Sequence, residues 1–270
     1  KEKDKLDEND KNIPVIIPAA GEDFSLSSIL NNKPKSMFEI AGKALLDWQI
    51  GALNSNRLTN ITVITGYKSG AMKAEGVTFQ ENKDYKRGSE LHTLIEARKK
   101  MTSGFIMVYS DILFEENIMS QILACQEDIV LIVDNTIQYH APESNKVQDF
   151  VISKNKHQST RRKINFDCEN IISKIGSNLK PETATHEFIG LAKFSKNGAE
   201  QLLQTYEDCV KNYSGNLQEA ANINQFKFTD LIQEMIDRGY VANFLEIHKG
   251  WLEIHSTEDI KLANHFLSNS

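Results

Sequence analysis

The chain has 270 residues, 40% hydrophobic and 25% charged, with a formal net charge of −6 at pH 7. This is ordinary globular composition, and the length suits one large α/β domain or two small ones. The acidic balance argues against a broad nucleic-acid surface, and the apolar runs are too short to span a bilayer, so neither nucleic acid nor membrane is an expected partner.

The first twelve residues contain a single apolar side chain and are expected to form a disordered linker or tail, ahead of one domain over residues 13–270. This start lacks the apolar segment of a signal peptide, so a cytoplasmic protein is the default expectation. A domain cut from a longer polypeptide would also begin in this way.

Runs rich in Val and Ile alternate with helical patterns, which predicts βαβ units and a mostly parallel sheet. In chain order, strands are expected at 15–18, 61–65, 77–80, 105–109 and 129–134, with helices at 44–53, 90–100 and 118–124.

The regularity loosens between about residues 137 and 177, where weak strand signals around Phe150, Phe166 and Ile172 predict an insertion of antiparallel hairpins beside the sheet. Beyond it, a strand at 187–194, helices at 196–211 and 228–238, and two mutually paired strands at 241–247 and 251–255 are predicted. Ser256 and Asp259 have capping-box spacing, so a final helix should begin after Ser256.

Two segments near the start could bind a nucleotide. The first strand runs into Pro18-Ala19-Ala20-Gly21, small residues that let backbone N–H groups approach a base or phosphate closely. Twelve residues past Gly21, Lys33 and Lys35 flank Pro34 and place positive charge near that loop, as the phosphates of a nucleotide require.

These segments, followed by Ile40-Ala41-Gly42-Lys43-Ala44-Leu45, resemble the opening of the sugar-phosphate nucleotidyltransferase superfamily. Ser110-Asp111-Ile112-Leu113-Phe114, Glu187-Phe188-Ile189-Gly190-Leu191 and Gly250-Trp251-Leu252-Glu253-Ile254 continue the resemblance in order. It is closest to the small cytidylyltransferases for phosphocholine and 2-aminoethylphosphonate, as in the nucleotidyltransferase domain fused to phosphoenolpyruvate phosphomutase.

The resemblance implies a Rossmann-like α/β fold, with a mixed, mostly parallel central sheet flanked by helices and a small antiparallel insertion. The superfamily's usual GxGxRL turn reads Gly21-Glu22-Asp23-Phe24-Ser25-Leu26 here, so its arginine is missing. Lys33 and Lys35 would then carry more of the contact with the triphosphate.

Magnesium prefers hard oxygen ligands, typically one or two carboxylates with phosphate oxygens and water. Asp111 follows a predicted central strand, at the edge where open α/β sheets bind ligands, and Asp111 and Glu253 are the predicted metal pair. His255 stands where relatives often have an acidic residue. A histidine is a poor magnesium ligand, so His255 is expected to contact the substrate or support the metal site.

Further residues are candidates for binding the two substrates. The resemblance implies Asn82, Ser89 and Glu90 as contacts to the base or ribose, with a simple turn and helix start as the alternative. For the acceptor, Asp134 and Glu187 could pair with an ammonium group, and Trp251 could face a cation. His140, His186 and the run Arg161-Arg162-Lys163 could hold a phosphonate, or form a solvated basic face.

The predicted activity is Mg²⁺-dependent transfer of CMP from CTP to a small phosphonate such as 2-aminoethylphosphonate, with release of pyrophosphate. Asp111 and Lys35 are the expected catalytic residues. Phosphocholine or a sugar 1-phosphate is the alternative acceptor. An inactive nucleotide-binding regulatory domain is the alternative of another class, and fusion to a phosphoenolpyruvate phosphomutase domain is expected for the full-length protein.

Overall fold

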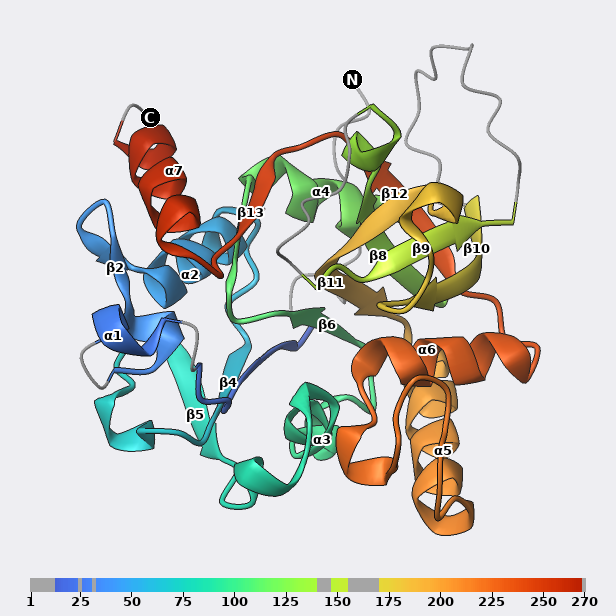
Figure 1. Ribbon diagram of the computed structural model, residues 1–270. Helices are drawn as coiled ribbons and strands as arrows, with labels where there is room; N and C mark the ends of the chain where they lie inside the picture. The colour runs from blue at the N-terminus through green and yellow to red at the C-terminus, as the bar shows by residue number, and fades with distance from the viewer. Residues whose placement is uncertain (1–12, 24–25, 31–32, 140–146, 155–169, 269–270) are drawn as a thin grey trace, which may run out of the picture.

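The computed structural model describes residues 13–23, 26–30, 33–139, 147–154 and 170–268 (Figure 1). Its centre is a mixed sheet of nine strands in the order β5-β4-β1-β6-β11-β8-β12-β10-β9, in which β11 and β10 run against the others. The strands of this sheet are β1 (Val15–Ala19), β4 (Ile61–Thr65), β5 (Val77–Glu81), β6 (Phe105–Val108), β8 (Ile129–Asp134), β9 (Phe150–Ser153), β10 (Asn170–Gly176), β11 (His186–Phe194) and β12 (Asn243–Ile247).

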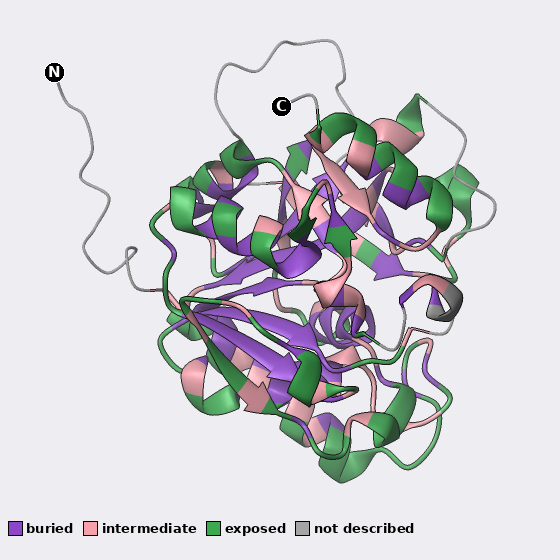
Figure 2. Ribbon diagram, turned by 90° about the vertical axis from the view of Figure 1, so that its left-hand side faces the viewer, coloured by how far each residue is buried: buried purple, intermediate pink, exposed green. Residues whose placement is uncertain are grey.

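Helices cover both faces of the sheet, so the central strands are apolar on both sides. Along β1, Ile16 packs in the core beneath α3, α5 and α6, whereas Ile17 packs in the core beneath α2 and α4. Figure 2 shows these buried strands between helices whose outward faces are exposed. The helices are α1 (Ser27–Leu30), α2 (Leu45–Ser55), α3 (Glu90–Ile95), α4 (Glu116–Ala124), α5 (Lys196–Asn212), α6 (Phe228–Asp237) and α7 (Thr257–Leu267).

The predicted helix at 90–100 is shorter in the structure, because α3 ends at Ile95 and a separate 3-10 turn follows at Arg98–Lys100. The capping box before α7 is confirmed, since Ser256 and Asp259 bond reciprocally to each other's backbone N–H groups. None of the helices in the described ranges is long and apolar enough to cross a membrane.

The prediction that residues 241–247 pair with 251–255 is wrong. β12 instead pairs in parallel with β8, and β13 (Trp251–Glu253) pairs antiparallel with β7 (Ile112–Phe114) in a separate two-stranded sheet. Lys249 and Gly250 separate the two strands with φ values of 63° and 84°, a left-handed turn that sends the chain away from β12. A second small sheet joins β2 (Glu39–Ile40) to β3 (Lys43–Ala44).

The antiparallel insertion is part of the main sheet rather than a layer beside it. β9 pairs with both β10 and β11, so the strands β11, β8, β12, β10 and β9 close on one another. The strand signal around Phe166, the expected tail at 1–12, His140 and Arg161-Arg162-Lys163 lie outside the described residues.

Candidate active site

The carboxyl ends of β1, β4, β5 and β6 lie at one edge of the sheet, because these neighbouring strands are parallel. Pro18, Ala19, Ala20 and Gly21 end β1 at this edge, and Asp111 follows β6 there. Ligands of open α/β sheets bind outside such an edge. Lys35 also lies at this edge, at the start of a short 3-10 turn (Lys35–Met37).

The ladder between β7 and β13 sets the distance between the two predicted metal ligands. Glu253 lies opposite Ile112, and the N–H of Ile254 donates to the carbonyl oxygen of Asp111 at 2.8 Å. Asp111 and Glu253 are 142 positions apart in the chain, yet this register makes them near neighbours.

Asp111, Glu253 and His255 form one cluster in which one ligand atom from each residue lies within 4.8 Å of the others. Nε2 of His255 is 2.6 Å from Oε1 of Glu253. That hydrogen bond is the main reason why the pKa of His255 is raised, although burial acts in the opposite direction. His255 therefore serves Glu253 as a hydrogen-bond partner within the same cluster.

Lys35 places a buried positive charge against this cluster. Its Nζ lies 2.7 Å from Oδ2 of Asp23, 3.2 Å from Oδ2 of Asp111 and 3.4 Å from Nδ1 of His255. Burial lowers the pKa of Lys35, but the carboxylates of Asp111 and Asp23 outweigh it, and the net shift is upward. The ammonium is thus held in its charged form where phosphates would need it.

The donor set fits a hard divalent cation. Two carboxylates with oxygens within 4.8 Å of each other repel, and a cation between them removes that repulsion. One or two carboxylates completed by substrate oxygens and water are the usual protein ligands of Mg²⁺. Asp111 and Glu253 meet this requirement, whereas His255 would suit a softer metal.

Lys33 is not brought into the cluster. Its side chain is 54% exposed and its Nζ lies 3.8 Å from Oε1 of Glu39, which is 68% exposed. The two lysines of the Lys-Pro-Lys turn therefore face different surroundings, and Lys35 alone of the two contacts Asp111.

The predicted nucleotide contacts beyond the first loop make hydrogen bonds within the protein. Asn82 is buried after β5, donates to Oγ1 of Thr93 and accepts from the N–H of Asp84. Ser89 caps α3 and donates to the carbonyl of Phe226. Oε1 of Glu90 accepts from the N–H of Phe228 at 3.0 Å, and burial raises the pKa of this carboxyl.

Among the predicted acceptor residues, Asp134 and Trp251 bind each other. Asp134 accepts hydrogen bonds from the N–H and hydroxyl of Thr136, from the N–H of Lys249 and from Nε1 of Trp251. These contacts tie the end of β8 to the start of β13. Glu187 lies opposite Asp134 on β11, where Gln148 donates to its Oε2 at 2.9 Å.

Two residues of this site were not predicted from the sequence. Asp23 occupies the first-loop turn where the family motif is altered, and the altered motif itself was the available signal. Gln49, on α2, donates to the carbonyls of Tyr109 and Ile112 at 2.7 and 2.8 Å. Gln49 thereby holds the backbone on both sides of Asp111, a role that nothing in the sequence around it indicates.

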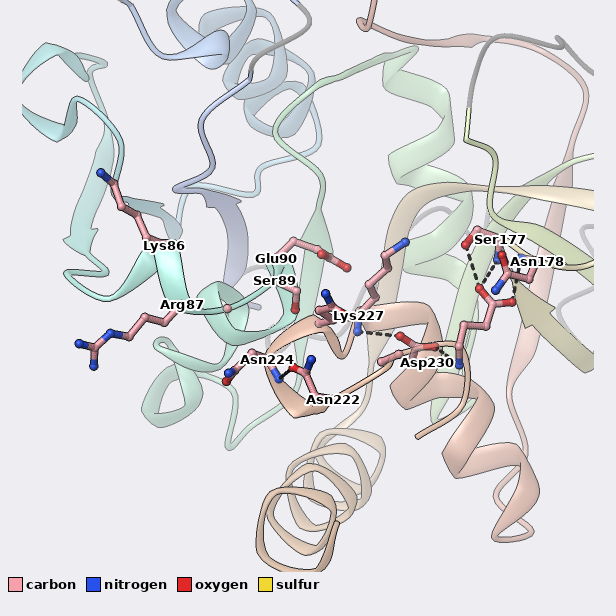
Figure 3. A pocket seen from close by; sticks show the side chains of 14 residues that line it. Lys86, Arg87, Ser89, Glu90, Ser177, Asn178, Asn222, Asn224, Lys227 and Asp230 are labelled. Carbon is pink, nitrogen blue, oxygen red and sulfur yellow. Dashed lines mark hydrogen bonds between the residues drawn. The ribbon is translucent and has the colours of Figure 1, made fainter. Parts of the chain in front are cut away.

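A cavity of about 1110 Å³ lies between the start of α3 and the segment leading into α6 (Figure 3), and its wall includes none of Asp111, Glu253, His255 and Lys35. Polar and charged residues make most of its wall, including Lys86, Arg87, Glu90, Glu219 and Lys227. A cavity of this size and polarity is suited to a charged small molecule.

The known proteins that resemble this chain include cytidylyltransferases. No family model matches the chain. The CTP:phosphoglutamine cytidylyltransferase of Campylobacter jejuni is 23% identical over 261 residues, which cover 92% of this chain and 98% of that protein.

Two solved structures illustrate the likeness in fold. The inositol-1-phosphate CTP transferase from T. maritima has a TM-score of 0.68 at 16% identity, covering 96% of this chain and 95% of the other. The CTP:phosphocholine cytidylyltransferase from Streptococcus pneumoniae has a TM-score of 0.65 at 13% identity, covering 95% and 99%. The predicted fold, the Rossmann-like α/β fold of nucleotidyltransferases, is thereby confirmed, and the relatives support an enzyme of the nucleotidyltransferase superfamily.

Proposed function

We propose that the chain is a Mg²⁺-dependent cytidylyltransferase that transfers CMP from CTP to a small phosphate or phosphonate acceptor and releases pyrophosphate. The observation that carries the proposal is the convergence of Asp111, Glu253 and Lys35 at the carboxyl edge of the sheet. Likeness to a CTP-dependent relative along 92% of the chain supports the choice of nucleotide.

In the proposed reaction, an oxygen of the acceptor's phosphate or phosphonate attacks the α-phosphorus of CTP in line with the leaving group. A new P–O bond forms, the bond from the α-phosphorus to the bridging oxygen breaks, and pyrophosphate leaves with that electron pair. The attacking oxygen is already an anion at neutral pH, so no general base is required. The protein's task is to position the reactants and stabilise charge.

Lys35 supplies the fixed positive charge for the α-phosphate and the departing pyrophosphate. Asp23 and Asp111 hold its ammonium from two sides, so its position is set before substrate arrives. The backbone at Ala19, Ala20 and Gly21 lies at the same edge and would receive the nucleotide.

Asp111 and Glu253 are the proposed ligands of Mg²⁺, with His255 orienting Glu253 through their hydrogen bond. The chemistry that the ion supplies when bound is neutralisation of charge on the phosphate oxygens. Asp111 also contacts Lys35, so this single carboxylate connects the metal site to the catalytic lysine.

The proposed acceptor is a small molecule with a phosphate or phosphonate group. 2-Aminoethylphosphonate is the predicted acceptor, and phosphocholine or a sugar 1-phosphate is the alternative. The names of the similar proteins add phosphoglutamine and inositol 1-phosphate to the set worth testing. A phosphonate substrate and a preceding phosphoenolpyruvate phosphomutase domain both remain predictions.

The test is a matrix of nucleotides and acceptors. CTP, UTP, GTP, ATP and dTTP are each incubated with Mg²⁺ and each of these acceptors, and pyrophosphate release is measured. We expect turnover with CTP and at least one acceptor, and none without added metal. Tight CTP binding with no pyrophosphate from any acceptor would instead favour an inactive nucleotide-binding domain.

Asp111→Asn is the decisive variant. It keeps the shape of the side chain but removes its charge, so turnover should fall by a factor on the order of 10³ or more. The variant Asp47→Asn, at an exposed position on α2, is the matched control. Full activity of Asp111→Asn with Mg²⁺ and an unchanged melting temperature would refute the metal assignment.

A further inference from the structure

The ammonium of Lys35 is held by the same kind of atoms that bind a metal ion. Its Nζ lies 2.7 Å from Oδ2 of Asp23, 3.2 Å from Oδ2 of Asp111 and 3.4 Å from Nδ1 of His255. Carboxylate oxygens and imidazole nitrogens are also the donor atoms of divalent cations. In this arrangement the charge of Asp111 is matched by a cation that belongs to the protein itself.

His255 extends the contact of Lys35 to the second proposed metal ligand. An ammonium has only hydrogens to offer, so Nδ1 of His255 accepts from Lys35. The other ring nitrogen, Nε2, then carries the hydrogen and donates it to Oε1 of Glu253 at 2.6 Å. Lys35 thus engages Asp111 directly and Glu253 through His255.

Lys35 is the most enclosed member of this group. Its side chain is 10% exposed, compared with 21% for Asp111, 20% for Glu253 and 36% for His255. An enclosed ammonium loses free energy when it exchanges a carboxylate for water, so it leaves Asp111 only for another anion. A cation that enters from solvent and binds Asp111 therefore meets the positive charge of Lys35.

Asp23 gives the ammonium a partner that it can keep. Of the two carboxylate oxygens around Nζ, that of Asp23 is the nearer, and the other oxygen of Asp23 accepts the N–H of Leu26 at 3.1 Å. Asp23 is thus fixed in place independently of Lys35. The flexible stem of a lysine permits a small shift away from Asp111, and phosphate oxygens are strong partners for an ammonium.

We propose that Lys35 sets the order of binding at this site. Without nucleotide its ammonium holds Asp111, and the phosphates of CTP draw it away, so that Asp111 and Glu253 receive the divalent cation together with CTP and not before it. Asp23 is the positioning residue that retains the ammonium during this exchange. The inference rests on the proposed function, since it concerns the metal and the nucleotide of that reaction.

Binding of Mn²⁺, followed by electron paramagnetic resonance, tests the exchange without any turnover. In the absence of nucleotide, Lys35→Met should bind Mn²⁺ about 10- to 100-fold more tightly than wild type, because the competing charge at Asp111 is gone. The double variant Lys35→Met/Asp111→Asn should lose this gain, which locates the ion at Asp111. Lys33→Met is the matched control, since this exposed lysine of the same turn contacts Glu39 instead.

CMP distinguishes exchange from simple repulsion between cations. It carries the α-phosphate but lacks the triphosphate chain that binds divalent cations by itself. Saturating CMP should tighten Mn²⁺ binding by wild type about 10-fold or more, and Mn²⁺ should tighten CMP binding by the same factor in calorimetry. In Lys35→Met the effect of CMP should be several-fold smaller, because Asp111 is already released.

Equal Mn²⁺ affinity of wild type and Lys35→Met, an equal gain in Lys33→Met, or an equal effect of CMP with and without Lys35 would overturn the exchange and leave the cytidylyltransferase standing. If Lys35→Met does not fold, Lys35→Gln replaces it with the same expectations, since it keeps a donor for the two carboxylates. Failure of the proposed metal site gives another result: Mn²⁺ would bind to none of these proteins, even with CTP, and both proposals would fall.

Discussion

Asp149, which directly precedes β9, makes a quantitative prediction about how the stability of the protein depends on pH. Burial raises the pKa of its carboxyl from 3.8 to about 7, and Glu90 adds to this effect. Glu253 and Glu219 act in the same direction, and Lys227 opposes them. In the unfolded chain these influences vanish, so the group should titrate near its ordinary value.

Proton linkage sets the direction in which the free energy of unfolding changes with pH. The pKa of Asp149 is higher in the folded protein than in the unfolded chain, so between pH 3.8 and about 7 the folded protein binds more protons than the unfolded chain. The contribution of Asp149 to the free energy of unfolding therefore falls as pH rises through that window. The difference between the two pKa values corresponds to about 4 kcal/mol, of which about 2.5 kcal/mol is expressed between about pH 5 and pH 8.

Asp149→Asn removes the titration while nearly preserving shape. The free energy of unfolding of variant and wild type, measured by urea titration without ligand, should therefore differ by about 2.5 kcal/mol more at about pH 8 than at pH 5, in favour of the variant. Packing differences between Asp and Asn cancel in this comparison, because they are the same at both pH values. A stability difference that stays constant between the two pH values would refute the reasoning.

Three further substitutions test how the site is built. Lys35→Met should lower kcat/KM by about 10²- to 10³-fold, because it removes buried charge at the α-phosphate, and steady-state kinetics should show a smaller loss for the exposed Lys33→Met. Gln49→Leu should lower the free energy of unfolding by about 2–4 kcal/mol, since the carbonyls of Tyr109 and Ile112 lose their donor. If kcat also falls further than in an equally destabilised variant remote from the site, Gln49 is a positioning residue. Gly190→Ala should destabilise the protein by more than about 1 kcal/mol, because Gly190 has φ 84° and an added Cβ would lie 2.4 Å from the Tyr109 ring. An unchanged melting temperature would contradict that clash.

The sequence by itself determined the alternation of strands and helices and the two acidic positions at their ends. Apolar runs such as 129–134 are buried on both faces of the sheet, and that pattern is visible in any single segment. Asp111 and Glu253 could be named because each follows or ends a short apolar strand within a motif that resembles a known family. The order of residues within a short segment is enough to predict a buried strand and the acidic residue at its end.

Tertiary structure decided which distant segments meet. The pairing of β13 with β7 rather than β12 depends on a left-handed turn at Lys249 and Gly250, and strand propensity alone does not reveal a partner. The same pairing places Glu253 beside Asp111. Burial raises the pKa of Asp149, and the carboxylates of Glu90, Glu253 and Glu219 act in the same direction although they lie far from it along the chain. Charges that lie far apart in the sequence acquire a shared environment from the fold, because burial and Coulomb interactions depend on distance in space and not along the chain.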